Sequence, residues 1–171
     1  MTAGRARLTL TDAEQKDAAA IAALLADTAR HLTATFGQGH WSNIPTERIV
    51  LRSMRESRVF VARDAAGRII ATLRLTAKKP FAIDRAYFTQ VKRPLYLLDM
   101  AVDVSRQRTG IGRQCMDEAA RIAREWPADA IRLDAYDAPA GAGEFYAKCG
   151  YQPRGSYTYR VVPLLYYELL L

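Results

Sequence analysis

The segment Gln107-Arg108-Thr109-Gly110-Ile111-Gly112-Arg113 combines residue types that suit the binding of an anion. Its two glycines let the backbone approach a ligand without interference from a Cβ atom. The segment opens a predicted helix over residues 112–126, whose first amides have no intrahelical acceptor and lie at the positive end of the helix dipole. Arg106, Arg108 and Arg113 add cations. The spacing therefore predicts a backbone cradle for an anion, with phosphate as the best candidate.

Two common phosphate-binding motifs do not fit this segment. A P-loop requires a Lys followed by Ser or Thr after its second glycine, and that Lys is absent. A dinucleotide-binding fingerprint requires a third small residue at the position of Cys115. On these residues alone, a glycine-rich helix start without a ligand remains the alternative.

The pattern Gln-x-x-Gly-x-Gly at a helix start after a buried strand resembles motif A of the GNAT superfamily, the acyl-CoA-dependent N-acyltransferases. Val102-Asp103 precedes it and is similar to the family's Val-Asp-Pro strand ending, although Val104 replaces the proline. The segment Phe145-Tyr146-Ala147-Lys148-Cys149-Gly150-Tyr151 resembles the Phe-Tyr-x-Lys-x-Gly-Phe/Tyr signature near the family's C-terminus. The order of the expected elements also matches, so the resemblance covers essentially the whole chain.

The resemblance implies that acetyl-CoA is the co-substrate and wedges between the fourth and fifth strands, without a metal ion. The implied cofactor-binding residues are Met100, Ala101, Val102, Gln107, Arg108, Thr109, Gly110, Ile111, Gly112 and Arg113. In this family the acceptor amine attacks the thioester directly, so neither cysteine needs a catalytic role. Tyr146 matches the position of the family's usual general acid, and its alternative is a core aromatic residue.

Asp99 is the candidate for the second catalytic residue. It is the lone charge in the apolar run over residues 95–102, and burial would raise its pKa. An amine with a pKa of about 10 must lose a proton before it attacks, and Asp99 could accept that proton. It could equally anchor the amine or pair with an Arg. The family often places a Glu nearer the start of this strand, where Tyr96 and Leu98 stand here.

The elements that must position these residues follow from periodicity and turn signals. We expect a strand over residues 6–11, a capping box with Thr11 as N-cap and Glu14, and an amphipathic helix from Ala18 to Leu32 that Gly37 ends. A second helix begins at Pro45. Then follow a hairpin over 59–62 and 69–76, an irregular segment over 78–93, the strand over 95–102 and the helix over 112–126. A strand over 130–135, a helix over 140–149 and strands over 154–161 and 164–170 complete the chain.

This order predicts a single α/β domain of the α+β type over residues 1–171. We expect a mixed, mostly antiparallel central sheet of about six or seven strands, with helices on both faces. The acceptor site should come from His40-Trp41, the terminal strands and the segment over 78–93, where Asp84, Tyr87 and Thr89 could line a lid. Asp134 and Asp137 flank the end of the fifth strand.

Composition sets the remaining expectations. The 171 residues carry a net charge of +7, two Cys and two His, which argues against a disulfide framework and a structural zinc site. No apolar run approaches a membrane span, so a cytoplasmic protein is expected. The sequence thus predicts an N-acetyltransferase that transfers an acetyl group from acetyl-CoA to a primary amine of a small molecule. The alternatives are a protein N-terminal or lysine acetyltransferase, a non-catalytic acyl-CoA-binding regulatory module and a basic nucleic-acid binder. We expect no membrane or nucleic-acid partner and leave a homodimer open.

Overall fold

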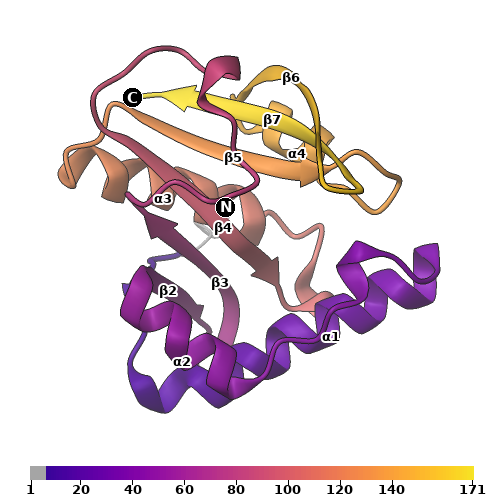
Figure 1. Ribbon diagram of the computed structural model, residues 1–171. Helices are drawn as coiled ribbons and strands as arrows, with labels where there is room; N and C mark the ends of the chain where they lie inside the picture. The colour runs from indigo at the N-terminus through magenta and orange to yellow at the C-terminus, as the bar shows by residue number, and fades with distance from the viewer. Residues whose placement is uncertain (1–6) are drawn as a thin grey trace, which may run out of the picture.

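A twisted seven-stranded sheet forms the centre of the computed structural model, which describes residues 7–171 (Figure 1). The strands are β1 (Thr11–Asp12), β2 (Arg58–Arg63), β3 (Ile69–Thr76), β4 (Pro94–Val102), β5 (Ala130–Tyr136), β6 (Gln152–Tyr159) and β7 (Val162–Leu170). Their spatial order is β1-β2-β3-β4-β5-β7-β6. Only β4 and β5 pair in parallel, and the other neighbours are antiparallel. The mixed, mostly antiparallel sheet is therefore confirmed.

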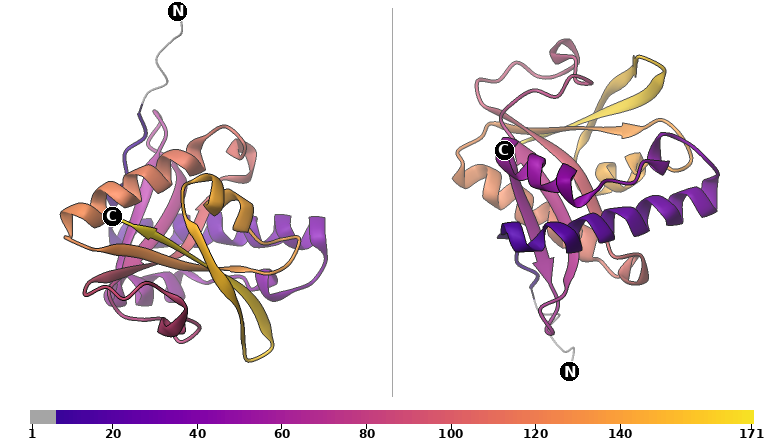
Figure 2. Two further views of the ribbon diagram at one scale, coloured as in Figure 1. Left: turned by 90° about the horizontal axis from the view of Figure 1, so that it is seen from above. Right: turned by 60° about the horizontal axis from the view of Figure 1, so that its bottom comes forward.

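Helices cover both faces of the sheet (Figure 2). Helices α1 (Ala18–Phe36) and α2 (Glu47–Glu56) lie on one face, and α3 (Ile111–Glu125) and α4 (Gly143–Lys148) lie on the other. The main core lies under α3, where Cys115, Ala119 and Ala123 are fully buried. A second cluster joins α1 and α2 to β2. The sheet thus has a packed helical layer on each side.

The feature of the fold that matters most for function is the divergence of β4 from β5. The two strands pair only from Pro94 to Tyr96, against Ala130 to Arg132. Beyond these residues they splay apart, as Figure 1 shows. The β4 backbone from Leu97 onward consequently has no strand partner on its β5 side, which leaves its amides and carbonyls free to bind a ligand.

A bulge in β4 changes the direction of Asp99. Thr72 pairs with Ala101 but Arg74 pairs with Leu98, so β4 contains an extra residue between them. Asp99 adopts a φ of 51°, in the left-handed region. Its side chain is 49% exposed, so the expectation that this carboxylate is buried is wrong. Simple alternation along the strand fails here because the bulge interrupts it.

The N-terminal expectations need correction. Ala6 lies outside the described residues, and β1 comprises only Thr11 and Asp12, which pair with Val61 and Phe60. Thr11 is therefore in a strand and is not a helix N-cap. Glu14 and Asp17 instead form a capping box around a short 3₁₀ turn before α1. The pairing with β2 keeps the chain extended and moves the cap three residues along.

The other predicted elements are present with small shifts of their ends. Gly37 ends α1 with a φ of 82°, and Gly150 follows α4 with a φ of 90°. Helix α2 begins at Glu47, two residues after Pro45, and Thr46 is its N-cap. Helix α4 is shorter than expected, because residues 140–142 remain outside it.

Candidate active site

The predicted anion cradle lies at the start of α3, directly after β4. Gly110 is the N-cap of α3 with a φ of 87°, a conformation that side chains other than glycine rarely adopt. The side-chain amide of Gln107 donates from Nε2 to the carbonyl of Val102 at 3.3 Å, and the Thr109 hydroxyl donates to the carbonyl of Arg106 at 2.6 Å. These bonds shape the loop, while the first amides of α3 keep no intrahelical acceptor. The loop can therefore offer several N–H groups to one anion.

A cavity of about 560 Å³ extends from this cradle along the opened edge of β4. Its walls also include Tyr146, Phe145, Lys148 and Cys149 of the α4 region. Eight of the ten predicted cofactor-binding residues line it: Met100, Ala101, Val102, Gln107, Arg108, Gly110, Gly112 and Arg113. The cradle and the free strand edge thus belong to one continuous space.

Thr109 and Ile111, the two remaining predicted cofactor-binding residues, do not line this cavity. Both line a separate hollow, on the side where Arg106 lies. Arg106 is held by Asp64 at 2.7 Å and so does not add free charge to the cradle. Only Arg108 and Arg113 of the three expected arginines line the cavity.

Gly112 serves the packing of two helices. A Cβ atom at this position would lie 3.2 Å from the ring of Phe145. The absence of a side chain therefore allows α3 to approach α4. This contact places α4, and with it Tyr146, beside the cavity.

Tyr146 lies on α4 with only 8% of its surface exposed, and it lines the cavity. Its ring packs against Phe145, Tyr151 and Tyr167. Burial, and to a smaller extent the charges of Asp134 and Cys149, raise the pKa of Tyr146. The phenol therefore keeps its proton at neutral pH and can donate it to a group in the cavity.

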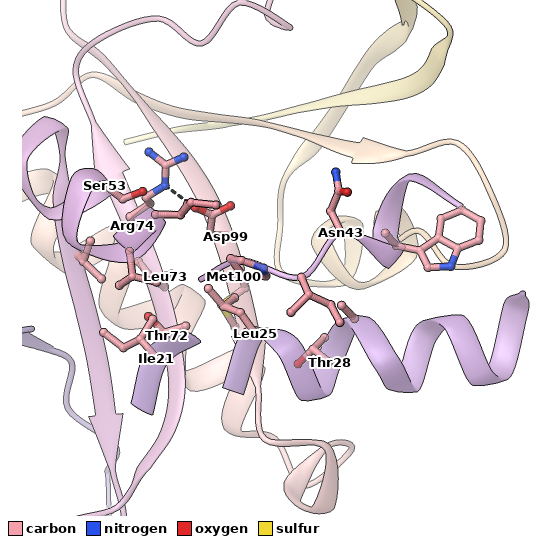
Figure 3. Close-up of a pocket in the computed structure, with 18 of the residues that line it drawn as sticks. Ile21, Leu25, Thr28, Asn43, Ser53, Thr72, Leu73, Arg74, Asp99 and Met100 are labelled. Carbon is pink, nitrogen blue, oxygen red and sulfur yellow. Dashed lines mark hydrogen bonds and ion pairs between the residues drawn. The ribbon is translucent and has the colours of Figure 1, made fainter. Parts of the chain in front are cut away.

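A second cavity of about 650 Å³ lies between the sheet and the helices α1 and α2 (Figure 3). It shares Thr28, Leu32, Met100 and Ala101 with the first cavity. The two cavities therefore meet at the bulged part of β4. A ligand in one can reach a ligand in the other at this point.

Asp99 lines the second cavity and is paired with Arg74 of β3. The Arg74 Nε donates to Asp99 Oδ2 at 2.5 Å, and Figure 3 shows this ion pair on the sheet wall above Leu25 and Thr28 of α1. Pairing with an arginine was one of the alternatives for Asp99. Its position at the cavity also leaves it within reach of an acceptor.

Asp134 is a functional candidate that the sequence left unassigned. It is two residues beyond Arg132, the last β5 residue that pairs with β4, and faces the α1 side with Arg132 and Tyr136. Among residues 7–171, its carboxylate forms no hydrogen bond or ion pair. Burial, together with the negative charge of Asp99, raises the pKa of Asp134 to about 6. Asp134 lines neither of the two cavities, but it lies across the splay from Asp99 and close enough for the two carboxylates to repel each other.

The cysteines have no signs of reactivity. Burial raises the pKa of Cys115 to about 12, and this side chain is inaccessible. Burial also raises the pKa of Cys149, although this residue lines the first cavity. A thiolate nucleophile is disfavoured at both positions.

Of the elements expected to form the acceptor site, only some line the second cavity. His40 and Trp41 line the second cavity and pack against Tyr136. Neither the segment over 78–93 nor the terminal strands contribute to the walls of this cavity, so a lid formed by Asp84, Tyr87 and Thr89 stays a prediction.

Contacts on the same face of the sheet as α1, but over β5, β6 and β7, hold this segment in place. The Glu168 carboxylate accepts hydrogen bonds from the Thr89 amide, Arg132 and Arg154. Tyr87 packs against Tyr166. This buried network anchors the segment to β5, β6 and β7, and the segment does not line the second cavity.

Neither a metal-binding cluster nor a membrane-spanning helix is present in the described part of the chain. No cluster of three or more His, Cys, Asp or Glu suited to a metal ion is present in residues 7–171. No helix in that range has the length and apolar character to cross a membrane.

Comparison with known proteins identifies the family. Residues 55–153, more than half of the chain, match the family model described as Acetyltransferase (GNAT) domain. The protein therefore belongs to the GNAT family of acetyltransferases and is an acyltransferase. No curated protein sequence matches the chain.

Solved structures share the fold at low sequence identity. A GNAT-family acetyltransferase from Listeria monocytogenes is 22% identical, with a TM-score of 0.76 over 100% of this chain and 99% of that chain. The acetyltransferase yncA from Salmonella typhimurium, solved with its cofactor acetyl-CoA, is 15% identical, with a TM-score of 0.69 over 96% and 94%. A ribosomal-protein-alanine N-acetyltransferase from Brucella melitensis is 18% identical, with a TM-score of 0.68 over 96% and 100%. At these identities the likeness establishes the fold alone.

Proposed function

We propose that this protein transfers an acetyl group from acetyl-CoA to a primary amine of a small molecule. The observation that carries the proposal is the junction of the two cavities at Met100 and Ala101. One cavity offers a cradle for a phosphate group and a free strand edge, as a coenzyme A molecule requires. The other opens onto the same strand and has the volume of a small-molecule site.

The residues present fit acetyl-CoA. The amides at the start of α3, with Arg108 and Arg113, suit its pyrophosphate. The unpaired edge of β4 from Met100 to Val102 suits the amides of the pantetheine chain. When bound, acetyl-CoA supplies the activated acyl thioester.

We assign the proton transfers to Asp134 and Tyr146. A protonated amine must lose a proton before its nitrogen can attack the acyl carbon. Asp134 lies across the splay from Asp99, which lines the second cavity, and it has a pKa of about 6 and no cation to neutralise it within residues 7–171. It can therefore attract the ammonium group of an amine at the cavity junction and accept its proton. The Tyr146 hydroxyl, which stays protonated, can donate to the departing thiolate.

We assign Asp99 a role in positioning the amine and not in proton transfer, because its carboxylate is already engaged by Arg74. We propose that it orients the amine at the cavity junction. The two cysteines need no covalent role in this direct transfer.

The test is a screen for thiol release from acetyl-CoA against a panel of amines, with the Tyr146→Phe variant as the matched control. We expect thiol release that depends on an amine and falls strongly in the variant, while free CoA still raises the melting temperature of both proteins. Stabilisation by CoA without amine-dependent thiol release would instead indicate a non-catalytic binding module. No stabilisation at millimolar CoA would contradict the cofactor assignment itself.

A further inference from the structure

The second cavity, between the sheet and the helices α1 and α2, is the one in which we place the acceptor. Its walls are apolar on the sides that would enclose the body of a substrate. Helix α1 contributes Ile21, Leu25, Ala29 and Leu32. The loop before α2 and α2 itself contribute Trp41, Ile44, Pro45, Ile49 and Val50, and the sheet contributes Val59, Leu73, Met100 and Ala101. Such walls stabilise a ligand by removing its apolar surface from water.

The charged side chains on these walls form one ion pair with each other. Apart from His40, which stacks on Tyr136, the charged lining residues among those that the structure describes are Arg74 and Asp99. They bind each other, so Arg74 is not a free cation for the carboxylate of an amino acid. A second ammonium group, as in a polyamine, would have to leave water for a wall of Ile and Leu side chains, which is costly.

Two exposed apolar side chains mark the rim of the cavity. Ile44 and Ile49 are 49% and 52% exposed, although both line the cavity. Large apolar side chains that gather at a concave site indicate a ligand that covers them. An apolar ligand body would cover both residues and leave the amine directed towards the junction of the cavities.

We infer that the acceptor is a primary monoamine whose body is apolar and uncharged, such as an arylalkylamine or alkylamine, without a carboxylate or a second ammonium group. This inference rests on the proposed function, since it names the substrate class for the same cavity. The apolar body lies among α1, α2 and β3, and the nitrogen lies near Asp99, where β4 lines the cavity. The charged atoms thus all lie at one end of the site.

The experiment compares three probes in two separate assays. Calorimetry on the protein saturated with free CoA measures the binding of 2-phenylethylamine, phenylalanine and spermidine without any reaction. Phenylalanine differs from 2-phenylethylamine only by a carboxylate, and spermidine carries additional ammonium groups without the ring. We expect 2-phenylethylamine to bind at least tenfold more tightly than either of the others. Equal or tighter binding of phenylalanine or spermidine would overturn the inference.

A rim variant tests the location of the apolar body. Ile49→Thr keeps the branched shape of a half-exposed side chain and removes apolar surface, so we expect the dissociation constant for 2-phenylethylamine to rise about fivefold. Val161→Thr is the matched control, because Val161 is 79% exposed at the β6–β7 turn and does not line this cavity. An unchanged affinity in Ile49→Thr, with the fold intact by circular dichroism, would overturn the placement.

Turnover with acetyl-CoA separates this inference from the proposed function. Selective binding of 2-phenylethylamine without acetylation of any amine would support the apolar site and contradict the proposed function. Acetylation of spermidine, phenylalanine or a peptide N-terminus in preference to 2-phenylethylamine would support acetyl transfer and overturn the apolar monoamine.

Discussion

The carboxylate of Asp134 has no hydrogen-bond or ion-pair partner among residues 7–171, and we therefore predict that its removal stabilises the protein while impairing catalysis. Asp134 has a pKa of about 6 in the folded protein, against 3.8 for an unperturbed Asp, chiefly because of burial. The folded state therefore binds this proton more tightly than the unfolded chain does. Between these two pKa values the unfolded chain loses the proton first, so the free energy of unfolding falls as the pH rises.

The size of the effect follows from the two pKa values. The full cost of holding Asp134 ionised in the folded state is about 3 kcal/mol, and it is reached above pH 6. At pH 5 the cost is about 1.5 kcal/mol, and well below pH 3.8 it vanishes. Asp134→Asn removes the ionisable group and keeps its shape. We expect this variant to gain about 3 kcal/mol of stability at pH 8, or roughly 6–12 °C in melting temperature for a chain of this size.

Urea denaturation at pH 5 and pH 8, on the wild type and Asp134→Asn, measures this difference. In the same variant we expect a large loss of turnover and the loss of the acidic limb of kcat/KM near pH 6. Asp99→Asn is the control, because it changes an exposed ion pair and should lower stability by less than about 1 kcal/mol at both pH values. A destabilised Asp134→Asn at pH 8, or one with wild-type turnover, would refute the assignment of Asp134 as an unpaired base.

Three further substitutions test other parts of the site and fold. Tyr146→Phe should lower kcat by roughly 10²- to 10⁴-fold with CoA affinity nearly intact, measured by steady-state kinetics and calorimetry; an unchanged rate would leave Tyr146 a packing residue. Gly110→Asp should abolish the stabilisation by CoA in a thermal-shift assay, because it places a carboxylate at a cradle position whose φ is 87°; a normal shift would move the phosphate site elsewhere. Glu168→Gln should destabilise the fold by about 3–5 kcal/mol in urea denaturation, because it leaves the buried Arg132 without its anion; a loss under 1 kcal/mol would show that this network is unimportant.

Local sequence was sufficient to predict the glycine-rich start of α3 and to single out Tyr146, which lines the first cavity. Gly110 and Gly112 stand at the start of an amphipathic helix that follows an apolar strand, and all three signals lie within a short segment. Tyr146 could be found because its motif is also contiguous. The helices and the hairpin followed from periodicity, which depends on neighbouring residues.

The roles of the two aspartates could not be predicted in the same way. The exposure of Asp99 depends on a bulge, whose position is set by the pairing of β4 with β3. Asp134 became a candidate only when the end of the β4–β5 pairing was known, which depends on segments far apart in the sequence. The anchoring of the segment over 78–93 likewise depends on Glu168, a distant residue that binds Thr89. In each case tertiary contacts determine the environment of the side chain.

The most direct test of acetyl transfer follows the acetyl carbon by NMR, with ¹³C-labelled acetyl-CoA and 2-phenylethylamine as the acceptor. If the enzyme transfers the acetyl group to the amine, an N-acetyl amide signal grows in proportion to the free thiol released and is absent without enzyme or with the Gly110→Asp variant. Loss of the thioester as free acetate, at a rate independent of any amine in the panel, would contradict this transfer.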